Sequence, residues 1–510
     1  MRIKTIISLC FLPFVISLIV FLSRFSMIGS HPCTDEGYYA YYSMLFNSFS
    51  KNKDLVFSSL YFESINLYPF LCSFVFEFKT NPFLLLRSID LIFSCFAFII
   101  LYYICKNITS KKYISLLIIL PFIYILNNPK YIQAGFKNSI NISVCFIYIG
   151  VYIHLINKQN RKNLYILSGF CLGFSTLLRE LHLVYTLLLI FVFFKNNYLN
   201  FKLIIAGFTL SFVIVLIIMQ IFTDYDFILN IIKSYFSMAN YYHKVSSIDL
   251  FDSVLFSIKK VGYDFVSLIL LFIPIILNLK TIKYNQKTIL LLIIFITILF
   301  IEPFVKLCMP YHIATLFFIT PIFIAKLVSI NSSNKVCHRG FKEIFIIYSL
   351  IFYNIFLIYH SIPGYINRLG NKTISNIKPL MSGSWDEEFA SKSQYILISK
   401  IIKENSKKGD TLAISSTAHV LFPLTGLFPN SPSLVDLYRT SIILGMPILK
   451  DALTKNPPDL IYLSERDPAI YNKLNNIINT IGAYDLVSEH PINQSLHYGK
   501  FAAKIYKFRN

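Results

Sequence analysis

The sequence predicts a polytopic α-helical membrane protein that carries a smaller α/β domain at its C-terminal end. Of its 510 residues, 55% are hydrophobic and only 14% are charged, whereas soluble proteins have about 25% charged residues. Apolar runs close to the roughly 20 residues that cross a bilayer recur through residues 1–360. Basic residues concentrate in every second loop between these runs, which is the pattern that membrane insertion produces.

We expect about eleven spanning helices in a transmembrane domain over residues 1–360. The first apolar run is longer than a signal-peptide core and has no small-residue cleavage site after it, which favours an uncleaved helix. Three runs are short and fit tilted helices or a re-entrant hairpin. The expected spans lie near residues 5–27, 84–105, 113–128, 138–156, 164–178, 181–195, 202–222, 264–280, 288–304, 312–330 and 343–360.

The loop charges predict the orientation. Arg2 and Lys4 precede the first span, so the positive-inside rule places the N-terminus in the cytoplasm. Acidic residues gather in the opposite loops, including a first outer loop at about 28–84. An odd number of spans then places the C-terminus outside. The basic loops lie near residues 106–112, 158–162, 195–202, 280–287 and 335–342.

The net charge of +21 does not indicate nucleic-acid binding, because the basic residues lie in short loops between apolar runs rather than on one soluble face. The cysteines give little further information. Most of the nine lie in or beside expected spans, as small buried apolar residues do. Cys33 and Cys72 share the first outer loop, where they could form a disulfide or remain separate thiols.

Residues 361–510 are less apolar and predict a single extracytoplasmic α/β domain. Short apolar runs bounded by Gly or Pro are typical of buried strands. No glycine-rich phosphate loop appears among them. We expect helices at 387–404, 442–455 and 468–480, and strands at 410–416, 459–464, 484–489 and 501–507.

The adjacent carboxylates Asp35 and Glu36 are the candidate catalytic residues, because they lie just beyond the first span. One of them would remove a proton from an acceptor hydroxyl as its oxygen attacks an anomeric carbon. The other would orient that base, hold a sugar hydroxyl or help to bind a metal. We favour Asp35 as the base. The alternative is a solvated loop in which an acid caps the following helix.

Tyr38 and Tyr39 follow the acidic pair directly. Aromatic rings at a membrane surface stack on sugars or hold a helix at the level of the lipid headgroups. The residues alone do not separate these two interpretations, so both tyrosines are candidates for sugar or acceptor contact.

A lipid phosphate needs cationic partners. The candidates near the outer ends of expected spans are Arg87, Arg179, Lys306 and His312. Each has a competing explanation without a substrate. Arg87 and Asp90 are spaced for an i, i+3 ion pair, and Arg179 would pair with its neighbour Glu180 or extend its side chain to the headgroups.

The sequence gives little support for a metal site. It contains no His pair at i, i+4 and no His-x-His motif. Asp224 and Asp226 have the D-x-D spacing, but they also suit the start of a helix. A divalent metal is therefore left open, and no residue is assigned to one.

Taken together, these residues resemble the membrane glycosyltransferases of the C-type fold, which include protein O-mannosyltransferases and the enzyme that transfers aminoarabinose to lipid A. The resemblance depends on the first helix, the Asp35-Glu36 pair, the segment Leu67-Tyr68-Pro69-Phe70 before the span with Arg87, and the stretch from Lys306 to His312. It extends over the whole chain, but its motifs are short.

The resemblance implies a polyprenyl-phosphate sugar donor, an active site outside the cytoplasm, a carboxylate base in the first loop, and basic residues on the lipid phosphate. The chain length and the exported C-terminal domain also resemble the serotype-converting glucosyltransferases, which modify O-antigen at the bacterial inner membrane. On this resemblance the sugar would be glucose, and the acceptor would be lipid-linked O-antigen or lipopolysaccharide.

Three other functions compete. A lipid-sugar flippase or other transporter would place polar groups near the bilayer midplane, whereas the charges here gather at helix ends. An O-antigen polymerase would have its large outer loop in the middle of the chain. A sensor with an exported domain would not need so many spans.

Overall fold

The computed structural model describes a helical bundle and a C-terminal domain. The expected spans 264–280 and 288–304, most of 343–360, and the expected domain boundary near 361 lie outside the described residues. The residues described are 3–28, 34–48, 55, 67–78, 82–126, 140–179, 182–194, 198–223, 310–333, 348, 350–352, 354–355, 394–415, 418–464, 468–494 and 499–509.

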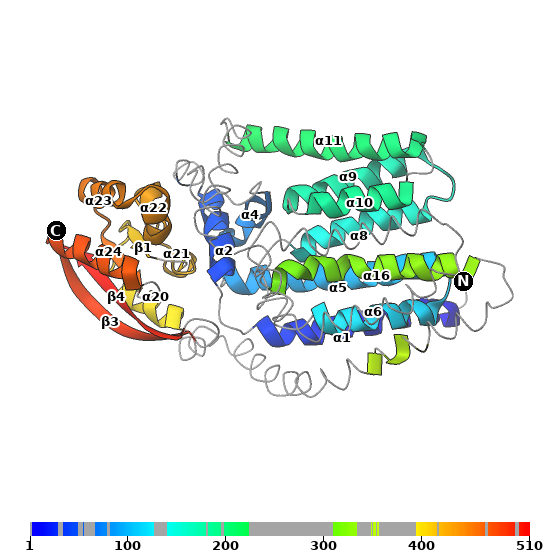
Figure 1. The fold of residues 1–510 in the computed structure, drawn as a ribbon, viewed down its shortest axis with the longest axis horizontal. Coiled ribbons are helices and arrows are strands. Elements are labelled where there is room, and N and C mark those ends of the chain that lie inside the picture. The colour runs from blue at the N-terminus through cyan, green and yellow to red at the C-terminus, as the bar shows by residue number, and fades with distance from the viewer. Residues whose placement is uncertain are drawn as a thin grey trace.

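The bundle consists of long helices that run side by side along the longest axis of the molecule (Figure 1). Each begins and ends within a few residues of an expected span. Among the described residues, Pro82–Thr109 and Leu199–Phe222 are long and apolar enough to cross a membrane, so the full number of spans stays a prediction. The bundle helices are α1 (Ile3–Ile28), α5 (Pro82–Thr109), α6 (Lys112–Leu126), α8 (Ile140–Ile156), α9 (Lys162–Leu178), α10 (His182–Phe194), α11 (Tyr198–Thr223) and α16 (Pro310–Ser333).

Small residues set the closest helix crossing in the bundle. A Cβ atom at Gly169 of α9 would lie 2.0 Å from the carbonyl oxygen of Ile204, and one at Gly207 of α11 would lie 2.0 Å from that of Ile166. Only glycine permits this reciprocal backbone approach, which is typical of membrane helix pairs. The crossing holds α9 and α11 together independently of the first loop.

Three short elements of the first loop lie between the bundle and the C-terminal domain (Figure 1). They are α2 (Thr34–Asn47), α4 (Leu67–Cys72) and the 3₁₀ helix η1 (Ser73–Glu77). Cys72 is a buried free thiol, whereas Cys33 lies outside the described residues. The described residues of this loop thus form short helices that pack on one another between the two larger parts.

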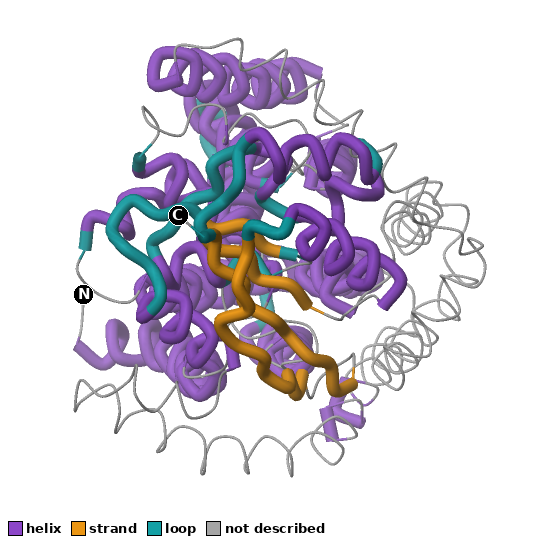
Figure 2. Tube along the Cα trace, turned by 90° about the vertical axis from the view of Figure 1, so that its left-hand side faces the viewer, coloured by secondary structure: helices purple, strands orange, loops and turns teal. Residues whose placement is uncertain are grey.

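The C-terminal domain is a four-stranded sheet with helices on both faces. The strands are ordered β1-β2-β4-β3; β1 and β2 are parallel, whereas β4 is antiparallel to β2 and to β3. Figure 2 looks onto this domain with the bundle behind it. Its elements are α20 (Gln394–Glu404), β1 (Leu412–Ile414), α21 (Leu421–Thr425), η3 (Pro432–Leu434), α22 (Leu437–Ile443), α23 (Met446–Lys455), β2 (Leu460–Ser464), α24 (Pro468–Ile481), β3 (Tyr484–Gln494) and β4 (Gly499–Phe508).

All four expected strands are present. The expected helix over 442–455 is instead divided between two helices, because Gly445 has a φ of 92° that no helix accommodates and Pro447 lies in the first turn of the next helix. The expected helix at 387–404 is described from Gln394 onward. The short helix α21 was not predicted.

Alternate strand residues face the two sides of the sheet. Ala413, Ile461 and Leu463 pack with the side chains of α23 and α24. Leu412 and Tyr462 face the other way, into a buried cluster that continues into α2 of the first loop. The C-terminal domain therefore shares a hydrophobic core with the segment that carries the acidic pair.

Candidate functional site

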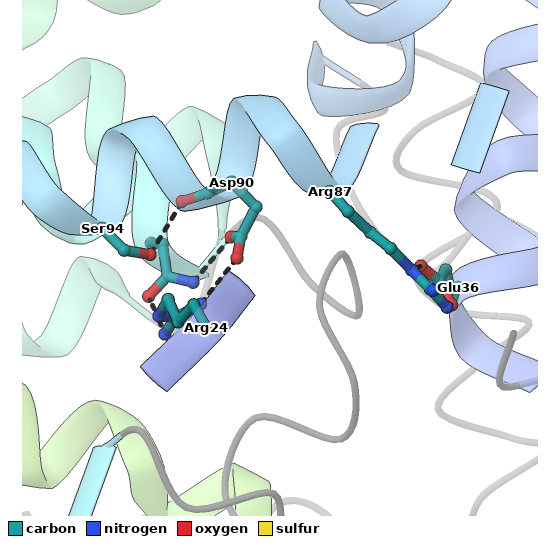
Figure 3. A network of polar contacts seen from close by, with 6 residues as sticks. Arg24, Glu36, Arg87, Asp90 and Ser94 are labelled. Atoms are coloured by element: carbon teal, nitrogen blue, oxygen red, sulfur yellow. Dashed lines mark hydrogen bonds and ion pairs between the residues drawn. The ribbon is translucent and has the colours of Figure 1, made fainter. Parts of the chain in front are cut away.

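The site begins at the first turn of α2, where Glu36 forms a buried ion pair with Arg87 of α5 (Figure 3). The guanidinium donates from Nε to Oε1 at 2.6 Å and from Nη2 to Oε2 at 2.8 Å. Its Nη1 donates to the carbonyl oxygen of Ile28 at the end of α1. Arg87 thereby connects α1, α2 and α5 through one planar group, the bidentate geometry that favours arginine over lysine.

This pairing constrains the candidate roles of both residues. Glu36 is fully buried and Arg87 is 2% exposed, and each carboxylate oxygen of Glu36 accepts a hydrogen bond from the guanidinium. Such a pair holds a helix in place. Asp35 precedes Glu36 in the same helical turn, so its backbone position is set by the ion pair next to it.

The carboxylate of Asp90 binds Arg24 of α1 instead of Arg87, so the alternative explanation by an i, i+3 pair is wrong (Figure 3). Arg24 Nη1 donates to Asp90 Oδ2 at 2.6 Å, and Asn141 Nδ2 of α8 donates to Oδ1 at 2.6 Å. Asn141 Oδ1 in turn accepts from Arg24 Nη2 at 3.3 Å. Sequence reasoning missed Arg24 and Asn141, although a lone arginine inside an apolar span requires a buried partner.

The tyrosines after the acidic pair pack inside the molecule. Tyr38 is 7% exposed, and its ring lies edge-on to those of Tyr39 and His419, with centroid distances of 5.8 and 5.4 Å. Tyr39 is half-buried and contacts the ring of Tyr68 at 5.8 Å. Of the two, Tyr39 has the surface exposure that a contact with sugar requires.

His419 lies beside the start of α21, and its ring connects the C-terminal domain to α2, the helix that carries Asp35 and Glu36. It is 1% exposed, and its Nε2 lies 4.0 Å from Oδ2 of the buried Asp436. Burial lowers the pKa of His419 well below its usual range, and the nearby Arg439 guanidinium adds to this. The ring is therefore neutral at physiological pH. No local sequence pattern indicates this site, because residues 38, 419 and 436 come together only in the folded protein.

Arg179 is buried at the C-terminal end of α9, where its N–H donates to the Ser175 carbonyl at 3.1 Å. Its own carbonyl accepts from the N–H of His182 at 2.9 Å. His182 Nδ1 contacts the Ser143 hydroxyl, which also donates to the Ser175 carbonyl at 2.7 Å. Arg179 thus lies in a polar cluster with His182 that sequence reasoning did not identify.

The remaining candidates are placed only in part. His312 lies in the first turn of α16, whereas Lys306, Glu180, Asp224 and Asp226 lie outside the described residues. Within the described part of the chain, no three His, Cys, Asp or Glu side chains are placed to hold a metal ion.

The fold is similar to that of a solved structure, although the sequence matches no known family. No protein-family model matches the sequence, and no curated protein matches it. Among solved structures, the chain is similar to ArnT from Cupriavidus metallidurans, crystallised with undecaprenyl phosphate; the TM-score is 0.55, the sequence identity is 10%, and 98% of each chain is covered. The chain therefore shares the overall fold of this protein over nearly its whole length.

Proposed function

We propose that the protein is a membrane glycosyltransferase that moves a sugar from a polyprenyl-phosphate donor to an acceptor outside the cytoplasm. The observation that carries this proposal is the bidentate Glu36–Arg87 pair at the start of α2, in a chain with the fold of a protein that was crystallised with undecaprenyl phosphate. The pair holds the helix that carries Asp35, and the shared fold supports this class of donor.

In the proposed reaction, Asp35 accepts the proton of the acceptor hydroxyl while that oxygen forms a bond to the anomeric carbon. The bond between this carbon and the donor phosphate oxygen breaks, and polyprenyl phosphate leaves as an anion. Because a phosphate leaves without protonation, one base is sufficient. Glu36 does not act as a second base in this scheme, since Arg87 occupies both of its oxygens.

The donor phosphate would be held by Arg179, Lys306 and His312, and the half-buried Tyr39 would contact the sugar. We assign Arg87 to the positioning of α2, because its Nε, Nη1 and Nη2 all donate to protein oxygens. The proposed setting is the bacterial inner membrane with the active site on the periplasmic side. Glucose is the proposed sugar, and lipid-linked O-antigen or lipopolysaccharide is the proposed acceptor.

The test uses purified full-length protein with undecaprenyl-phosphoglucose and a lipid-linked O-antigen oligosaccharide. Loss of a general base typically lowers turnover about 10²- to 10⁴-fold, so Asp35→Asn should lower kcat by that amount. Asp410→Asn, on the exposed turn before β1, serves as a matched control and should leave kcat unchanged. A fully active Asp35→Asn protein would contradict the assignment, and sugar flux into vesicles without product would favour a transporter.

A further inference from the structure

The acidic helix α2 is held from two sides, and the second side belongs to the C-terminal domain. Figure 1 shows α21 beside α2, and the rings of Tyr41 and Phe422 lie 4.5 Å apart between them. Both side chains are fully buried. We call the contact made by Gly37, Tyr38 and Tyr41 with residues 419–422 the α2–α21 contact.

Gly37 makes the closest approach in the α2–α21 contact. A Cβ atom there would lie 2.4 Å from the backbone nitrogen of Val420 and 2.5 Å from its Cα atom. These distances are far below the 3.5–4.0 Å of ordinary contact. Because the facing atoms are backbone atoms, no rotamer change relieves the clash. The close approach of the Val420 backbone therefore explains why the residue after the acidic pair is a glycine.

His419 completes this contact through its ring. It lies edge-on to Tyr38 at 5.4 Å and 6.2 Å from the ring of Tyr41. Behind it, Asp436 caps α22 by accepting from the backbone N–H of Arg439 at 3.0 Å. The His419 side chain thus contacts Asp436 of its own domain on one side and packs against α2 on the other.

We propose that the C-terminal domain positions the acidic helix for catalysis, with Val420 and His419 as positioning residues. Arg87 holds α2 at Glu36, and α21 holds it at the next residues, Gly37 and Tyr38. Two contacts at successive residues fix both the axial position and the rotation of this turn, and with them the backbone position of Asp35. This inference rests on the proposed function only in naming Asp35 as the base.

The first measurement does not depend on activity. Amide hydrogen exchange of full-length protein in detergent micelles is compared for wild type and Gly37→Ala, in peptides covering residues 34–47. Because the added Cβ atom forces α2 and α21 apart, exchange in these peptides should rise about tenfold or more. Gly207→Ala is the matched control, since its Cβ atom would lie 2.0 Å from the Ile166 carbonyl oxygen, an even closer backbone approach, but in the α9–α11 crossing.

The second measurement separates positioning from general stability. With undecaprenyl-phosphoglucose as donor, Gly37→Ala and His419→Ala should lower kcat by up to about 100-fold, because small displacements of a base cost that much. The KM for the donor should stay near the wild-type value, since α2 does not hold the phosphate. His419→Phe, which keeps a ring on Tyr38, should recover most of the lost kcat.

Each result has a clear consequence. Unchanged exchange of residues 34–47 in Gly37→Ala would overturn the inference, as would an equal increase in Gly207→Ala. If His419→Phe is as slow as His419→Ala, ring packing is not the cause and His419 has no positioning role. If wild type itself forms no product while the exchange result is as expected, the proposed function fails but the domain contact stands.

Discussion

Two arginine–carboxylate pairs lie one helical turn apart on α5, yet they hold different parts of the molecule (Figure 3). Asp90 joins Arg24 of α1 and Asn141 of α8, so this network lies wholly within the bundle. Arg87 joins Glu36 of α2, which belongs to the first loop and not to the bundle. The same chemistry therefore serves bundle packing in one case and the placement of the acidic helix in the other.

The difference shows that burial and pairing alone do not tell whether an ion pair joins bundle helices or holds a helix of the candidate site. All four charged side chains are almost completely buried. What distinguishes the Glu36–Arg87 pair is its neighbourhood, because Asp35 precedes it and the α2–α21 contact follows it. A charge pair next to a candidate base influences chemistry through geometry, even when neither member touches the substrate.

The largest expected effect comes from breaking each pair in turn. Arg87→Met and Arg24→Met both leave a buried carboxylate without its cation, which costs about 3–5 kcal/mol of folding free energy. We expect turnover per folded molecule to fall about 100-fold in Arg87→Met, because α2 loses its fixed position. In Arg24→Met it should stay near wild type. Size-exclusion chromatography of detergent-purified protein gives the folded fraction for the comparison.

Equal losses of turnover in the two variants would show that the bundle network and the α2 pair act as one unit. The distinction drawn above would then be incorrect. Unaltered turnover in Arg87→Met would show instead that α2 keeps its place without this residue.

The sequence predicts the bundle well because each helix depends on a local apolar run. It also predicts the four strands of the C-terminal sheet, since short apolar runs between Gly and Pro are local signals too. It does not predict which arginine pairs with which carboxylate. Arg87 and Asp90 are neighbours on one helix, but their partners Glu36 and Arg24 come from chain segments more than fifty residues away.

The same limit applies to the contact between α2 and α21. Nothing near Gly37 in the sequence indicates Val420, and α21 is too short for its five residues to show a clear periodicity. His419 and His182 were missed for a related reason, because isolated histidines have no local pattern. Tertiary contacts between distant segments thus determine the candidate site, while local patterns determine the fold that carries it.

A smaller effect is expected when both charges of a pair are removed together. The double variant Glu36→Gln/Arg87→Met leaves no buried charge unpaired, so it should recover about 2 kcal/mol of stability relative to Arg87→Met. Its turnover should nevertheless stay low, because the bidentate link to α2 is absent. The matched double variant Asp90→Asn/Arg24→Met should be both stable and active. Urea titration and turnover of the same preparations measure the two quantities.

If the first double variant recovers its turnover together with its stability, the pair contributes only to folding. In that case α21 alone would be enough to hold α2, and the role of Arg87 in the candidate site would be lost.

The smallest expected effect concerns pH and the other side of α2. His419 faces Asp436 and Arg439 of its own domain and the rings of Tyr38 and Tyr41, and its pKa in the folded protein is well below its usual range. As pH falls below the unfolded value of about 6.5, the unfolded chain takes up a proton that the folded protein does not. The free energy of unfolding should therefore be independent of His419 protonation above that pH. Below it, this free energy should fall by about 1.4 kcal/mol per pH unit.

Urea titrations of wild type and His419→Phe between pH 5.5 and 7.5 isolate this term, because all other titrating groups are common to both proteins. The slopes of the free energy of unfolding against pH should differ between the two proteins only below about pH 6.5. Any loosening of α2 at low pH that depends on His419 should begin where its ring packs on Tyr38 and Tyr41. Equal pH dependence in both proteins would show that His419 takes up its proton as readily in the folded protein as in the unfolded chain, which its burial opposes.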